Sequence, residues 1–111
     1  MSLLAAALND PTLFDSFQDP AAGQTLYLVR NPQKRLQQSF YFVNDACDRY
    51  GRFLWFYVAS PPSCAKHLAV LDAEEGRIVD FPETQFSDAS PCVDPESGWV
   101  YWFSGYALYR R

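Results

Sequence analysis

The sequence predicts an all-β protein built of antiparallel β-propeller blades, and three observations lead to this prediction. Short runs of aromatic and β-branched residues, which strands favour, alternate with turns. Four of these turns begin with Asp and end with Gly, and glycine accepts the positive φ that closes such loops. The third observation is a repeat: Gly51 and Trp55 return as Gly98 and Trp102, with numbers that differ by 47 in both pairs (98 − 51 and 102 − 55). A period of this length is typical of propeller blades.

The first element expected is a short helix over residues 2–8, where Leu and Ala favour helix until Asn9, Asp10 and Pro11 end it. The run has no cationic leader, and nothing in the chain approaches the ~20 apolar residues of a membrane span. We therefore expect a soluble, cytoplasmic protein without a membrane partner. Residues 1–37 are interpreted as an N-terminal extension, in which residues 25–29 form a strand that closes the propeller ring.

The remaining residues, 38–111, are interpreted as a partial propeller. Residues 39–82 form one complete four-stranded blade, and residues 88–110 form most of a second. Both faces of the central strands are apolar, as expected of sheets covered by neighbours on each side. The Asp-to-Gly turns are residues 19–23, 48–51, 72–76 and 94–98. The predicted strands are residues 40–43, 53–58, 68–71, 77–81 and 99–103.

Composition excludes several classes of protein. The 111 residues allow one domain, and 49% hydrophobic and 17% aromatic residues are sufficient for a packed core. A net charge of −4 argues against nucleic-acid binding, which requires clustered cations. The odd number of cysteines, Cys47, Cys64 and Cys92, favours a reducing compartment, and one disulfide with a free thiol is the alternative.

Three residues are candidates for binding a ligand. Lys34 and Arg35 could bind the carboxylate of an acidic sugar, and the alternative is an exposed pair in a loop. Trp99 directly follows a predicted turn, so its indole could stack on a sugar ring. Trp55 and Trp102 recur at the structural period and are interpreted as core residues instead.

No catalytic residue and no metal ligand is assigned. Cys64 and His67 could share a metal or form a nucleophilic pair, but two ligands do not make a closed site, and a dyad needs further groups. Both residues are interpreted as part of the connection into the next strand. The acidic residues of the turns, Asp72 among them, are interpreted as ordinary solvated surface. No glycine-rich phosphate loop is present in the sequence.

Residues 12–57 resemble the beginning of the oligogalacturonate lyase family. The matching segments are Phe14-Asp-Ser-Phe-Gln-Asp-Pro-Ala-Ala-Gly23, Phe40-Tyr-Phe42 and Gly51-Arg-Phe-Leu-Trp-Phe56. The resemblance implies a seven-bladed propeller that cleaves uronic-acid oligosaccharides of pectin by β-elimination, with manganese bound by histidines of later blades. This chain has a single histidine, so it cannot form that metal site alone and has no cofactor of its own.

Two functional hypotheses follow. In the first, the chain is the N-terminal scaffold of a longer lyase-like propeller, whose remaining blades complete the site for a uronic-acid oligosaccharide. In the second, the chain is a small non-catalytic β-domain that binds a protein or a carbohydrate and self-associates through open strand edges.

Overall fold

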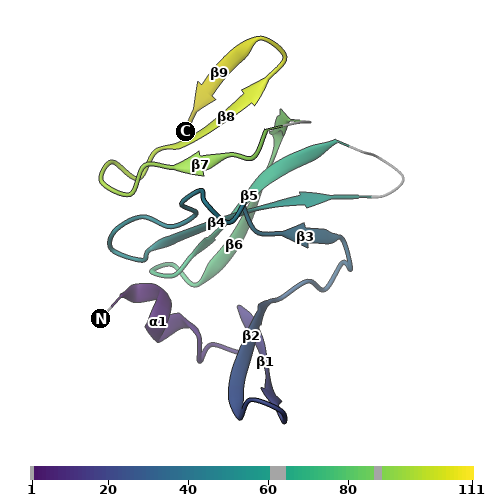
Figure 1. The fold of residues 1–111 in the computed structure, drawn as a ribbon, viewed down its shortest axis with the longest axis vertical. Helices are drawn as coiled ribbons and strands as arrows, with labels where there is room; N and C mark the ends of the chain where they lie inside the picture. The colour runs from purple at the N-terminus through teal and green to yellow at the C-terminus, as the bar shows by residue number, and fades with distance from the viewer. Residues whose placement is uncertain (1, 61–64, 87–88) are drawn as a thin grey trace.

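The computed structural model describes residues 2–60, 65–86 and 89–111 (Figure 1). The predicted all-β class is confirmed, because the described residues form nine strands and a single five-residue helix. Along the chain the elements are α1 (Leu3–Ala7), β1 (Phe14–Asp19), β2 (Gln24–Val29), β3 (Leu36–Gln38), β4 (Phe53–Ala59), β5 (Lys66–Asp72), β6 (Arg77–Phe86), β7 (Cys92–Val93), β8 (Val100–Ser104) and β9 (Ala107–Arg110).

The N-terminal segment folds as a helix followed by a hairpin. Ser2 caps α1, because its Oγ accepts a hydrogen bond from the backbone N–H of Ala5 at 3.0 Å. β1 and β2 pair antiparallel around the turn that starts at Asp19 and ends at Gly23, where φ is +67°. The strand predicted at 25–29 is thus β2, and its described partner is β1.

The central sheet is an antiparallel meander in the order β3-β4-β5-β6. The predicted strand at 40–43 is wrong, because the first strand is β3, which pairs with the last residues of β4. Residues 40–43 instead belong to a loop that continues through Asn44. Tyr41 donates its N–H to Ser90 Oγ at 2.8 Å, and Asn44 donates its side-chain amide to Pro91 O at 3.0 Å. The predicted boundary between residues 37 and 38 falls inside β3.

The C-terminal sheet has the order β7-β8-β9 and packs on one face of the central sheet. Trp55, Tyr57 and Leu68 of the central sheet share a core with Val100 and Trp102 of the C-terminal sheet. Burial of both tryptophans agrees with the prediction that they are core residues.

The other face of the central sheet packs against α1 and the base of the hairpin. Here Phe56, Val58 and Leu71 meet Ala7 and Phe14 in a second core. Successive residues of β4 therefore enter different cores, which explains why that strand is apolar throughout its length. The described strands form three separate, open sheets, so an all-β protein is established and propeller blades are not confirmed.

Candidate functional site

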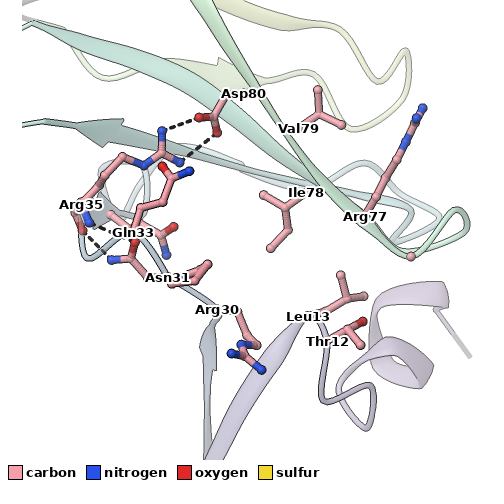
Figure 2. Close-up of a pocket in the computed structure, with 13 residues that line it drawn as sticks. Thr12, Leu13, Arg30, Asn31, Gln33, Arg35, Arg77, Ile78, Val79 and Asp80 are labelled. Carbon is pink, nitrogen blue, oxygen red and sulfur yellow. Dashed lines mark hydrogen bonds and ion pairs between the residues drawn. The ribbon is translucent and has the colours of Figure 1, made fainter.

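A cleft of about 750 Å³ lies between the chain that follows β2 and the beginning of β6 (Figure 2). Its volume is within the range of small-molecule binding sites. Polar side chains line much of it, and Leu13, Ile78 and Val79 contribute an apolar part. The full lining is Thr12, Leu13, Arg30, Asn31, Pro32, Gln33, Arg35, Gln37, Gly76, Arg77, Ile78, Val79 and Asp80.

A tight turn forms one wall of the cleft. Lys34 donates its backbone N–H to Asn31 O at 3.0 Å and has a φ of +54°, which is uncommon for a residue with a side chain. The Asn31 side chain connects the start of this turn to Arg35, which follows it. Its Oδ1 accepts a hydrogen bond from the N–H of Arg35 at 3.1 Å, and its Nδ2 donates one to the carbonyl of Arg35. This turn fixes the point from which the Arg35 side chain starts.

Arg35 is anchored to the opposite wall by Asp80. The guanidinium donates two hydrogen bonds to the two carboxylate oxygens, one of them 3.1 Å long, and both are visible in Figure 2. Such paired, charge-assisted bonds are among the strong ones in proteins. The guanidinium of Arg35 also holds the pKa of Asp80 below its ordinary value, with burial opposing this effect. Asp80 is therefore a carboxylate at neutral pH.

His67 lies beside the same carboxylate and faces the Oδ2 oxygen that Arg35 also contacts. Its Nε2 is 3.7 Å from Asp80 Oδ2, which is too long for a hydrogen bond. Nε2 of His67 and Nε of Arg35 are buried and have no hydrogen-bond partner among the described residues. The group formed by Arg35, His67 and Asp80 thus leaves two buried nitrogens without a hydrogen-bond partner among the described residues, which is unusual for buried polar atoms.

The charge of the cleft is opposite to that of the whole chain. Three arginines and a single carboxylate line it, whereas the chain has a net charge of −4. Arg30 donates to Pro11 O at 3.1 Å, and its Nε lies 3.9 Å from Asp15 Oδ1. Arg77 makes no ion pair with any described residue. In Figure 2, Ile78 points toward the segment that follows β2, whereas the side chain of Arg77, its neighbour in β6, points away from that segment. The cleft therefore combines an apolar centre with cationic side chains and side-chain amides.

The structure separates the three predicted ligand-binding residues. Arg35 lines the cleft, and Lys34 is exposed in the turn beside it without being part of the lining. Trp99 immediately precedes β8, is not part of this lining, and has the guanidinium of Arg110 4.2 Å above its ring. Sequence reasoning missed Arg30, Arg77 and Asp80, because only strand pairing brings β6 to the segment that follows β2.

The prediction that the acidic residues of the turns are solvated surface is wrong for Asp72. Asp72 is only 5% exposed. Its oxygens accept hydrogen bonds from the Arg52 guanidinium, both at 3.1 Å, and Oδ1 also accepts from the backbone N–H groups of Glu74 and Glu75. Asp72 therefore fixes the turn between β5 and β6 and does not belong to the solvated surface.

The cysteines provide no metal centre in the part of the chain that the structure describes. Cys64 lies outside the described residues, while Cys47 and Cys92 are free thiols. Burial raises the pKa of the Cys47 thiol, and the neighbouring Asp48 carboxylate acts in the same direction. No group of three or more His, Cys, Asp or Glu side chains among the described residues is placed to hold a metal ion.

Comparison with known proteins adds no relative. No family model, no curated protein and no solved structure matches the chain.

In the described part of the chain, no helix has the length and apolar character needed to cross a membrane.

Proposed function

We propose that the chain is a non-catalytic binding domain whose cleft takes a small carboxylated sugar, such as a unit of a uronic-acid oligosaccharide. The observation that carries the proposal is the excess of arginine in the lining of the cleft, in a chain that is otherwise acidic. Guanidinium groups bind carboxylates through paired, charge-assisted hydrogen bonds. The sugar class comes from the resemblance to the oligogalacturonate lyase family, and the proposal concerns binding alone.

The side chains of the cleft have separate roles in this proposal. Arg35 is already neutralised by Asp80, so it supports the wall of the cleft and does not bind the ligand carboxylate. Arg30 supplies the positive charge for the ligand, because its side chain is exposed and its long ion pair with the exposed Asp15, 3.9 Å, can be exchanged for a ligand carboxylate. The side-chain amide of Gln33 can bond sugar hydroxyl groups, because an amide both donates and accepts.

The test is a titration with a short galacturonate oligomer and with its methyl ester, followed by calorimetry. The acid should bind, and the ester should bind much more weakly because it carries no charge. Replacing Arg30→Gln should weaken binding of the acid by about tenfold or more, since a charge-assisted hydrogen bond contributes about 1.5–3 kcal/mol.

Arg49→Gln is the matched control. Arg49 is likewise an exposed arginine paired with an exposed carboxylate, that of Glu96, but it does not line the cleft. Equal affinity for the acid and the ester would refute the proposal. So would an equal loss of affinity in the Arg49 and Arg30 variants, because the effect would then come from overall charge and not from the cleft.

A further inference from the structure

One edge of the β1–β2 hairpin has no strand beside it. β2 pairs with β1 along one side, and this sheet contains only these two strands among the described residues. Apart from this pairing, the β2 backbone makes one hydrogen bond to the described residues, in which Gln37 Nε2 donates to Val29 O at 3.2 Å. A two-stranded hairpin is only marginally stable in water, and a third strand stabilises it.

β2 also differs from the other described edge strands in its residues. Natural proteins protect sheet edges with charged residues, with proline or with very short strands. β1 contains two aspartates, β6 contains charged residues and Pro82, and β9 contains Arg110. β3 and β7 have three and two residues. β2 has six residues, Gln24–Val29, without a charge or a proline, and is the unprotected edge.

The outer face of the hairpin carries apolar side chains beside this edge, and Asp15 and Asp19 lie on the same face farther from the edge, on β1. Leu26 and Leu28 are 39% and 56% exposed, and Phe17 of β1, directly opposite Leu26, is 47% exposed. The opposite face contributes Phe14 and Val29 to the second core. A strand added to β2 with leucines on the same face would extend this apolar strip.

We propose that the added strand is β2 of a second copy, paired antiparallel across a two-fold axis to give a four-stranded sheet. A two-fold axis brings the same patch of both copies together, so a strand that meets itself must carry no repelling charge. β2 satisfies this condition, whereas two copies of β1 would bring four aspartates together. The hairpin lies at the end of the molecule opposite the C-terminal sheet, which leaves room for the second copy (Figure 1).

Two variants of opposite charge test the pairing without assuming its register. Leu26→Lys with Leu28→Lys places only positive charges at the interface, and Leu26→Glu with Leu28→Glu places only negative ones. In light scattering, the unaltered chain of 12.7 kDa should approach twice this mass as its concentration rises. Each variant alone should remain at the single mass. An equimolar mixture of the two should regain the double mass, which also shows that both variants are folded.

Phe17→Lys is the matched control, because Phe17 lies on the same face but on the strand farther from the interface. This variant should associate as the unaltered chain does. Amide hydrogen exchange should slow at residues 24–28 as the concentration of the unaltered chain rises. The proposal is overturned if the unaltered chain keeps the single mass at every concentration. It is equally overturned if the mixture does not associate, or if the chain associates without slower exchange at residues 24–28.

Discussion

Thr84 provides the sharpest test of how β6 is held in place. The pairing of β5 with β6 is interrupted between Lys66 and Leu68, where β6 bulges. Thr84 lies in this bulge and is 1% exposed. Its Oγ1 accepts the backbone N–H of Leu68 at 2.9 Å and donates to Phe81 O at 2.6 Å. One hydroxyl therefore replaces the hydrogen bonds that the bulge removes from the ladder.

Thr84→Val keeps the shape of the side chain and removes only these hydrogen bonds. The N–H of Leu68, a fully buried residue, would lose its acceptor, which costs about 1–3 kcal/mol. Loss of the donor to Phe81 O adds about 1 kcal/mol. We therefore expect a destabilisation of about 2–4 kcal/mol. Thr84→Ser is the matched control, because it keeps the hydroxyl and loses one methyl group, at a cost of about 1 kcal/mol.

Urea unfolding, followed by far-ultraviolet circular dichroism, measures both variants against the unaltered chain. The slope of the free energy against urea should stay the same, and the midpoint should fall by about 1–2 M for the valine variant, given a slope of about 2 kcal/mol/M. A valine variant within about 0.5 kcal/mol of the unaltered chain would refute the reasoning, as would a serine variant less stable than the valine variant.

Two further predictions concern the core between the two sheets and the loss of stability at acidic pH. Trp55→Ala and Trp102→Ala should each reduce the free energy of unfolding by about 3–5 kcal/mol, measured by urea unfolding, because each leaves a large cavity in the core between the sheets. Near-neutral values for both would contradict their place in that core. Asp72→Asn should cost about 2 kcal/mol at neutral pH, because the charged partner of Arg52 is lost. The Arg52 guanidinium lowers the pKa of Asp72, so this contribution is complete above about pH 4 and disappears as the pH falls through the lower, folded-state pKa. The stability difference between the two proteins should therefore shrink in acid, and a difference that stays constant there would count against the assignment.

Turn chemistry was the part of the fold that the sequence could predict. Gly23, Gly76 and Gly98 all have positive φ values and end turns that lead into strands, because these conformations cost glycine little. Aromatic and β-branched residues predict the strands at 53–58, 68–71 and 99–103 nearly correctly, while the strand predicted at 77–81 is only the first half of β6. The error at residues 40–43 shows the limit of this approach. Phe40 is buried while Phe42 is exposed, and bonds to the distant Ser90 and Pro91 hold this loop, which strand propensity does not detect.

The cleft could not be predicted because its parts are far apart in the chain. Arg35 and Asp80 are separated by 45 residues, and they meet only because β4 and β5 lie between β3 and β6 with a particular register. Asp80 is opposite Ala69, and Ala69 is opposite Phe56, so all three point to the face that carries the second core. A shift of one residue would turn Asp80 to the other face. Local patterns at Lys34 and Arg35 suggested cationic binding, but register decides what faces them.

The two tryptophans of the 47-residue repeat point in directions that differ from those expected in a propeller. Blades of a propeller are related by rotation about the central axis, so equivalent side chains point the same way around the ring. If Trp55 and Trp102 were equivalent in this sense, Trp102 would point away from the central sheet, because Trp55 points toward the C-terminal sheet. Instead both tryptophans enter the same core from opposite sides. The sequence similarity of β4 and β8 therefore reflects a shared need for large apolar side chains at one interface, and it does not by itself require a rotational repeat.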